Sequence, residues 1–383
     1  GQRRIDPPVI NTPVAIKEDG MAAMQGHLGA INNNPNIPVT IAYASDQIDL
    51  PGVYTKPSRG AALFHQSSLL DIFGWEGVSA TAGLRFDYEH TGIDYFTESV
   101  NGDINIKPKS APPAMPPIFV ESDIVMQGSY SKDFWNILPK FALKYQPSST
   151  AVIYLSASKG YKTGGYNEQA FSKILQGALT QSIMGKVMPG VGTGTPGLTL
   201  EEQLSYDPET SWTYELGGRY EMFNRKFSFT YALFYSRVNN IQIIKLVDEG
   251  TAGRIVTNAG KSDSKGFEVS LKYVPVRNLS LFADYGFADA RFVNYQTEKQ
   301  VGRETTDVDY SGNYVPFAPR HTLSIGASYV HDFANSPLID RLVGNIQYAG
   351  AGKIYWTESN KTTPQNGGSG EELYQPFYGL VNG

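Results

Sequence analysis

The chain has 383 residues, enough for two ordinary domains or one large barrel, and its formal net charge is −5. This mild acidity gives no electrostatic footprint for nucleic acid, so we expect no nucleic-acid partner. The chain contains no cysteine, which excludes a disulfide scaffold and thiolate metal sites. No apolar run approaches the roughly 18 residues that a transmembrane helix needs, so any membrane-spanning structure here has to be a barrel.

The first part of the chain lacks a regular pattern. Prolines interrupt residues 1–58, and we predict an irregular segment there that belongs to an extracellular loop. From about Arg59 onward, alternating apolar and polar residues predict a β-structure that continues to residue 383. The strands are expected at about 59–70, 78–90, 134–146, 150–162, four within 207–295, 313–333, 341–356 and 373–381.

The alternation is strictest between residues 207 and 295. In the run from Trp212 to Glu221, every second residue starting with Trp212 is uncharged. The residues between them are polar or small and include Glu215 and Arg219. Such a two-residue period over nine or ten residues indicates long strands with one apolar and one wet face. The sequence therefore predicts an all-β protein with an antiparallel sheet.

The connections between the predicted strands alternate in length. Short ones fall at about 71–77, 146–150, 222–226, 274–278 and 332–340, and mostly longer ones at 91–132, 163–206, 246–253, 296–313 and 358–372. An up-and-down sheet then has every short turn at one end and the long loops at the other. Outer-membrane barrels have this asymmetry, with short periplasmic turns and long extracellular loops.

A soluble β-sandwich would also have apolar inward faces, so two further features are needed to choose between them. The predicted strands exceed the usual five or six residues of globular proteins. Tyrosines of the apolar parity also lie just before short turns, namely Tyr145, Tyr220, Tyr273 and Tyr329. Aromatic residues at that place form the girdle of a membrane interface, which favours the barrel.

Five segments resemble the barrel of TonB-dependent outer-membrane receptors, in the order and spacing of that family. They are YLSASKGYKTGGYN (154–167), DPETSWTYELGGRY (207–220), NAGKSDSKGFEVSL (258–271), LSLFADYGFADARFVNY (279–295) and YSGNYVPFAPRHTLSIGASY (310–329). The resemblance covers residues 59–383 and implies a transmembrane β-barrel in a Gram-negative outer membrane. It also implies TonB-dependent uptake of a nutrient such as a ferric siderophore, haem, cobalamin or a glycan, with a ferric siderophore or another iron source favoured.

The chain departs from the complete family pattern in two respects. We find no recognisable plug domain or TonB box, and we expect the chain to stop before the last strands of the family. About eleven strands are predicted for residues 59–383, whereas the resemblance implies a barrel of 22 strands. We therefore expect part of a barrel, whose partners would be outer-membrane lipid, TonB through a plug that this chain does not carry, and the nutrient.

The charged residues of the wet parity are expected to line the lumen of this barrel. They are Arg85, Asp87, Glu215, Arg219, Glu268, Lys272 and Asp284. We interpret Glu215 and Glu268 as partners of Arg219, Lys272, Arg85 or neighbouring residues that hold the strands in register. Contact with a plug or substrate is the alternative.

Candidate ligand contacts lie where a predicted strand opens into the long loop after residue 162. Tyr161, Lys162, Tyr166 and Asn167 combine a cation with aromatic rings, which suits an anionic or catecholate ligand. His90 ends another strand and is a candidate contact for iron or haem. The alternatives are a simple bend at the rim of the wall for the glycine-rich segment and a surface histidine for His90.

The sequence contains no pattern that indicates an enzyme, a metal site or a bound cofactor. The five histidines are scattered, none of them in an HExxH motif, and no GxSxG or P-loop motif is present. Two alternatives stay open beside the receptor: a passive porin or adhesin barrel, and a soluble β-rich carbohydrate-binding module.

Overall fold

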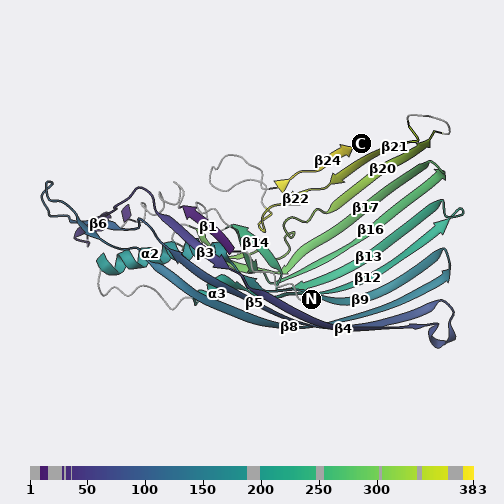
Figure 1. Ribbon diagram of the computed structural model, residues 1–383, viewed down its shortest axis with the longest axis horizontal. Helices are drawn as coiled ribbons and strands as arrows, with labels where there is room; N and C mark the ends of the chain where they lie inside the picture. The colour runs from purple at the N-terminus through teal and green to yellow at the C-terminus, as the bar shows by residue number, and fades with distance from the viewer. Residues whose placement is uncertain are drawn as a thin grey trace.

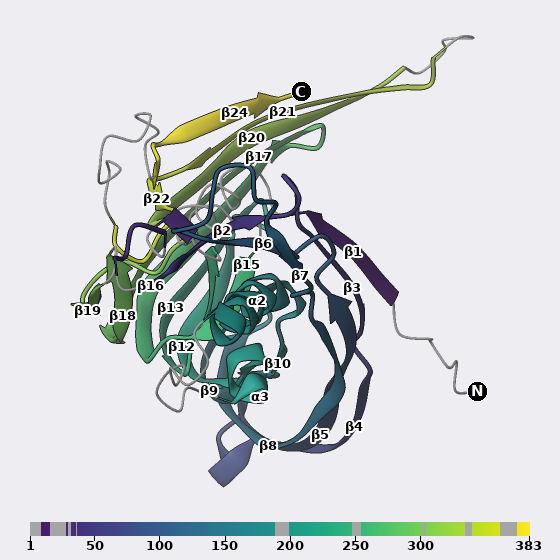
Figure 2. The ribbon, with the colours of Figure 1, turned by 90° about the vertical axis from the view of Figure 1, so that its left-hand side faces the viewer.

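The computed structural model describes residues 9–15, 28–29, 32–35, 37–187, 199–246, 254–301, 304–333, 339–360 and 374–383. Most of this part of the chain is antiparallel β-structure, and its largest unit is a 13-stranded sheet. The sheet forms a curved wall with slanted strands (Figures 1 and 2). No helix in the described ranges is long and apolar enough to span a membrane.

The wall follows the chain from one side to the other. Its order is β1-β3-β5-β8-β9-β12-β13-β16-β17-β20-β21-β24, and β4 pairs with β5 beside β3. The strands are β1 (Val9–Ala15), β3 (Asp49–Thr55), β4 (Ser58–Leu70), β5 (Val78–Glu98), β8 (Val125–Ser148), β9 (Ala151–Lys162), β12 (Glu209–Met222), β13 (Phe227–Asn239), β16 (Lys261–Val276), β17 (Leu279–Asn294), β20 (His321–Asp332), β21 (Arg341–Ala351) and β24 (Tyr378–Asn382). Without β1 and β3, eleven of these strands remain in the described ranges from Ser58 onward, as many as the sequence predicts.

The short turns lie together at one end of the wall, on the right in Figure 1. The turn between β12 and β13 is typical: Phe223, Asn224 and Arg225 have φ values of 53°, 55° and 64°. Three successive left-handed residues reverse the chain within the four residues that separate these strands. The up-and-down topology expected from the alternating loop lengths is therefore confirmed.

The wall strands β5 and β8 extend further than the alternation predicts. Their pairing continues beyond Thr91 and Lys132 to Glu98 and Val125, so the loop expected over 91–132 is shorter. Upstream, β3 pairs with the end of β5 inside the segment that we expected to be irregular. The sequence prediction depends on polar residues at every second position of a strand. At these strand ends the inward residues Ile93 and Tyr95 are apolar or aromatic and buried, so that pattern is absent.

The far end of the wall carries a compact unit, which we call the head. It contains the three-stranded sheet of β2 (Val39–Tyr43), β6 (Ile104–Pro108) and β7 (Ile118–Val120), the pair β10 (Gly165–Tyr166) and β11 (Ser205–Tyr206), the 3-10 helix η2 (Glu168–Ala170), and helices α2 (Phe171–Val187) and α3 (Leu200–Leu204). Figure 2 shows α2, α3 and β10 on the concave side of the wall. The head thus lies in the mouth that the wall surrounds.

Helix α2 was not predicted, since residues 163–206 were expected to form a loop. Its residues Phe171, Leu175, Leu179 and Ile183 recur every fourth position and are almost completely buried. Leu175, Leu179 and Ile183 join the core beside β2, and Phe171 packs against Tyr54 and Tyr95 of the wall. The helix therefore joins the two apolar cores of the head.

Three hairpins complete the described structure at the same end. They are β14 (Gln242–Leu246) with β15 (Arg254–Asn258), β18 (Gln296–Val301) with β19 (Glu304–Asp309), and β22 (Ile354–Tyr355) with β23 (Tyr374–Gln375). A third apolar cluster, around Phe292 and Tyr295, packs at the base of the first hairpin and beside Tyr310. Most of the loops expected at 246–253 and 358–372 lies outside the described residues.

Candidate functional site

The outer face of the wall is apolar across neighbouring strands. Leu155, Leu216 and Leu233 lie side by side in the register of β9, β12 and β13, and they are 51%, 39% and 49% exposed. Large apolar side chains left open in one continuous row are unusual for a soluble surface. The row instead fits the band that faces the acyl chains of a membrane.

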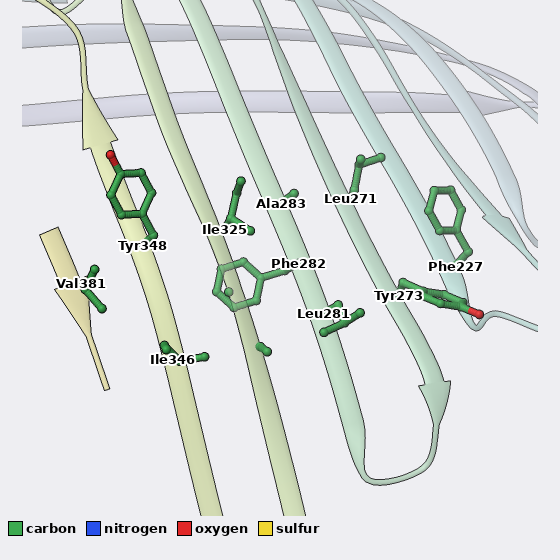
Figure 3. A pocket seen from close by; sticks show the side chains of 12 residues that line it. Phe227, Leu271, Tyr273, Leu281, Phe282, Ala283, Ile325, Ile346, Tyr348 and Val381 are labelled. Carbon is green, nitrogen blue, oxygen red and sulfur yellow. The ribbon is translucent and has the colours of Figure 1, made fainter. Parts of the chain in front are cut away.

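Tyrosines border this apolar face near the short turns. Tyr145, Tyr273 and Tyr329 all point outward and are roughly half exposed. Beside Tyr273, a shallow apolar hollow of about 600 Å³ crosses β13 to β24; Figure 3 shows Leu271, Leu281, Ile325, Tyr348 and Val381 along it. Its lining is apolar and belongs to successive wall strands, so the hollow is part of the membrane-facing surface rather than a site for a polar ligand.

The inner face carries the charged residues that the sequence predicts for the lumen. On β5, the Arg85 Nε lies 2.8 Å from Asp87 Oδ1. On β12, Glu215 accepts a hydrogen bond of 2.5 Å from the Tyr154 hydroxyl of β9. Glu268, Lys272 and Asp284 share this face by register, and within the described chain no ion pair joins these three to one another.

The pairing expected for Glu215 is different in the structure. Arg219 binds Glu221 on its own strand, at 2.5 Å, and leaves Glu215 to Tyr154. Residues two apart on one strand lie about 7 Å apart on the same face, whereas Glu215 and Arg219 are about 13 Å apart along the strand. The ion pairs Arg85–Asp87 and Arg219–Glu221 therefore each join two residues of the same strand. Glu215 is instead bound across strands, by the hydrogen bond from Tyr154 of β9.

Polar contacts attach the head to the inner side of the wall. Lys56 forms an ion pair of 2.7 Å with Glu168 of η2, and Lys132 of β8 donates to Ser205 of β11 at 3.0 Å. Both contacts are partly buried, so they fix the position of the head in the mouth more firmly than surface pairs would. The candidate functional site is this mouth: the inner wall with the head above it.

Comparison with known proteins identifies this architecture. The model of the family "TonB dependent receptor-like, beta-barrel" matches residues 25–383. The chain belongs to this family. It is therefore an outer-membrane β-barrel chain from a family of transport receptors, not of enzymes, and the barrel expected from the sequence is confirmed.

Individual relatives are distant. The probable TonB-dependent siderophore receptor PiuA of Acinetobacter baumannii is 24% identical over 140 residues, which are 37% of this chain and 18% of that protein. The solved ferric yersiniabactin uptake receptor FyuA from Yersinia pestis is 18% identical with a TM-score of 0.43, over 90% of this chain and 43% of FyuA. The solved siderophore receptor PiuA from A. baumannii is 13% identical with a TM-score of 0.44, over 91% of this chain and 46% of PiuA. The chain thus spans less than half the length of these receptors.

The residues predicted to contact a ligand lie in different environments of the receptor chain. Tyr166 is 1% exposed in the head and donates a hydrogen bond of 3.1 Å to Glu201. Burial, together with Glu201, raises the pKa of the Tyr166 phenol well above its usual range. The neighbouring Asn167 is also buried and binds the backbone of Val256.

Of the other candidates, Tyr161 and Lys162 lie at the end of β9, whereas His90 lies inside β5 and not at a strand end as expected. Tyr161 donates to Glu89 Oε2 at 2.9 Å, and Lys162 is exposed at the end of β9. His90 Nδ1 lies 2.8 Å from Asp133 Oδ1, in the outward parity of β5 and β8. The structure therefore does not gather the five residues into one open site. In the described ranges, no group of three or more histidines and carboxylates could hold a metal ion.

Three asparagines act as clamps between segments, a role that the sequence pattern does not predict for any of them. Asn167 accepts from Val256 N–H and donates to Val256 C=O, both at 2.8 Å, across 89 positions of the chain. Asn32 binds Ile41 in the same way, and so does Asn360 with Tyr314. An asparagine side chain can pair with the backbone N–H and C=O of one residue, as a neighbouring strand would, because its amide offers both a donor and an acceptor. No sequence signal marks them, since the partner of Asn167 is remote in the chain.

Proposed function

We propose that this chain forms part of the barrel of a receptor that takes up a scarce nutrient through TonB, with a ferric siderophore or another iron source as the nutrient. The family match over residues 25–383 carries the proposal. The siderophore assignment is supported by what relatives are named for, since PiuA is described as a siderophore receptor and FyuA as a ferric yersiniabactin receptor. Within the chain we propose residues 59–383 as barrel wall with its loops, and residues 1–58 as an extracellular segment whose strands β1 and β3 extend the wall sheet.

The mouth is where the ligand would first meet the receptor. The head occupies the concave side of the wall, so a ligand that enters has to bind the head or displace it. Lys162 is the exposed cation of the predicted ligand contacts, at the end of β9. Tyr161 lies next to it and already binds Glu89, which would hold its ring at the rim. We propose Lys162 and Tyr161 as first contacts for an anionic ferric chelate.

Below the mouth, the inner wall offers charges to whatever fills the lumen. Arg85, Asp87, Glu215 and Glu268 face inward there, and Tyr154 orients Glu215. In the proposed receptor these side chains contact a plug that couples the barrel to TonB. Tyr166, Asn167 and His90 serve the packing of the head and the pairing of strands in this arrangement, and would reach ligand only after rearrangement.

Uptake of labelled iron by a Gram-negative host that lacks its own siderophore receptors tests the proposal. The receptor that contains this chain should restore uptake from at least one ferric siderophore, and deletion of TonB from the host should abolish it. Lys162→Ala should raise the concentration needed for half-maximal uptake, whereas Lys159→Ala, three residues away in the outward parity, should not. Uptake that persists without TonB would instead identify a passive pore, and no uptake from any iron source would refute the assignment of iron.

A further inference from the structure

Aromatic rings on the inner face of the wall lie directly opposite glycines of the neighbouring strand. The register pairs Tyr95 with Gly128, Tyr154 with Gly217, Phe234 with Gly266 and Phe282 with Gly326. Because a glycine has no β-carbon, the space above its backbone is open to a ring from the next strand. Each of these strand boundaries thus holds one ring-on-glycine pair.

In each pair the ring occupies the place that a β-carbon on the glycine would take. A β-carbon built on Gly217 would lie 2.5 Å from Cζ of Tyr154, and in the Phe234 pair the corresponding distance is 2.8 Å. The Phe282 ring fills the same place over Gly326, and Figure 3 shows this ring lying across the neighbouring strand. A residue other than glycine would therefore displace the ring.

All four pairs lie at boundaries of one kind. We call the boundary between two wall strands that a long connection joins a seam, and the four are β5–β8, β9–β12, β13–β16 and β17–β20. At each of them the ring comes from the strand that leaves a short turn, and the glycine comes from the strand that follows the long connection. At a further seam of the described wall, β21–β24, the Tyr348 ring covers Gly379 from the outer face instead.

The seams are the boundaries at which the strand register is least determined. Within a hairpin the short turn fixes the register, whereas a long connection leaves it open. A shift by one residue would turn the apolar side chains into the lumen, so the surroundings of the wall oppose it. A shift by two residues keeps every side chain on its own face. The alternation of the sequence therefore does not select between the observed register and a shift by two.

The ring-on-glycine pairs do make this selection. After a shift by two residues at β13–β16, Phe234 would face Ser264 or Glu268, whose side chains occupy the place of the ring. The other three seams are alike, because no glycine stands two positions before or after the paired one. We propose that these inward rings are register locks, which join each hairpin of the wall to the next in a single register.

Disulfide capture across β13–β16 tests the proposal in the receptor that contains this chain, refolded into lipid vesicles. Ser236→Cys/Ser264→Cys joins two partners of the observed register. Ser236→Cys/Ser262→Cys and Val238→Cys/Ser264→Cys join residues that become partners only after a shift by two, one pair for each direction. Partners in an antiparallel ladder lie close enough for a disulfide, whereas residues two positions off are about 7–8 Å apart. The chain itself contains no cysteine that would compete.

The test variant Phe234→Ala removes one lock, and the control Phe229→Ala removes a ring of the same strand that lies opposite Leu271. A cross-strand pair of this kind contributes up to about 1 kcal/mol, or about fivefold in the ratio of two registers. The ratio of shifted to observed cross-link should therefore rise about fivefold in the test variant and stay unchanged in the control. An unchanged ratio in the test variant, or an equal rise in both, would overturn the proposal.

A second pair of variants tests the lock from the side of the glycine. Gly217→Ala places a β-carbon where the ring lies, whereas a β-carbon at Gly344 of β21 meets nothing within 4 Å. With Ser158→Cys/Thr213→Cys for the observed register and Ser158→Cys/Ser211→Cys for a shifted one, Gly217→Ala should raise the shifted fraction and Gly344→Ala should not. This pair keeps every ring, so it decides the question where Phe234→Ala gives no assembled receptor. Equal fractions in the two glycine variants would refute the lock, and neither readout depends on the proposed transport.

Discussion

The wall and the head are stabilised in opposite ways although they belong to one chain. In the head, Leu175, Leu179 and Ile104 are completely buried in a core like that of a soluble domain. In the wall, side chains such as Leu155 and Leu233 point outward and stay about half exposed. The buried apolar residues of the described chain lie in the head, near the hairpins, or at strand ends that touch them. The wall therefore depends on its hydrogen-bonded ladders and not on a core of its own, whereas the head depends on its core.

This contrast predicts that a cavity in the head unfolds the head without opening the wall. Leu175→Ala removes a side chain with 0% exposure and should lower the free energy of unfolding of the head by about 2–5 kcal/mol. Hydrogen exchange measured by mass spectrometry should then become faster in α2 and in β2–β6–β7, while the ladders between β12 and β17 remain protected.

The exposed position Gln181 on the same helix provides the control. Gln181→Ala should leave the exchange of α2 and of the sheet unchanged. Faster exchange in the wall strands after Leu175→Ala would contradict the separation, because it would mean that the wall needs the core of the head.

The wall should respond to charge according to parity alone. Val269 lies at the centre of the outward apolar run of β16, and Ser270, the next residue, points inward. Val269→Arg should lower the free energy of unfolding from lipid vesicles by about 2–4 kcal/mol, because the cation would face acyl chains near the middle of the bilayer. Ser270→Arg should change it by much less, and denaturant titration of the two variants in the same vesicles makes the comparison. Equal effects at the two positions would show that the outer face is not the lipid face.

The same contrast explains what the sequence predicts well. In β16, residues 267–273 alternate because lipid lies on one side and the lumen on the other, so a period of two is visible in the sequence. Where β5 continues through Ile93 and Tyr95, the inward face is covered by the head and carries apolar residues, so the polar half of the alternation is absent and the sequence does not predict this strand end. The inner-wall parity of Glu215 and Arg219 was predictable, but their partners were not, because pairing depends on distances along and across strands.

The sequence does not predict helix α2 for a different reason. Its apolar residues Phe171, Leu175, Leu179 and Ile183 do show a four-residue spacing, which could have revealed it. Gly177 and Gly185 lie within the helix, and glycine lowers helix propensity by about 1 kcal/mol per residue. Packing in the head overrides that preference, and packing is not visible in a local pattern. The sequence likewise predicts Tyr166 and Asn167 as ligand contacts and not as buried residues, because their burial depends on contacts with remote segments.

The clamp at Asn167 tests how the head is joined to the hairpin β14–β15. Asn167→Ala removes both hydrogen bonds to Val256 and leaves the partly buried Val256 N–H without its acceptor. This loss should lower the local free energy of opening by about 1–3 kcal/mol. Asn167→Asp keeps the acceptor but sets a buried carboxylate oxygen against the Val256 carbonyl oxygen, so its effect should be at least as large. Exchange of the amide of Val256 is the measurement. If both variants exchange at the rate of the unchanged chain, the clamp contributes nothing to the connection.

The smallest expected effect is a pH dependence confined to the start of α3. The Thr199 hydroxyl and the Thr199 N–H both donate to Glu202 Oε2 at 2.8 Å, and they hold the pKa of that carboxyl below its ordinary value of 4.5. Because the folded pKa is lowered, the contribution of this capping box is present above pH 4.5 and is lost as the pH falls through the folded pKa. Hydrogen exchange in Leu200–Leu204, corrected for the intrinsic rate, should therefore accelerate below pH 4.5 in the unchanged chain. Glu202→Gln has no carboxyl to protonate and should show the same corrected exchange across that range, whereas an identical acceleration in this variant would assign the pH dependence to another group.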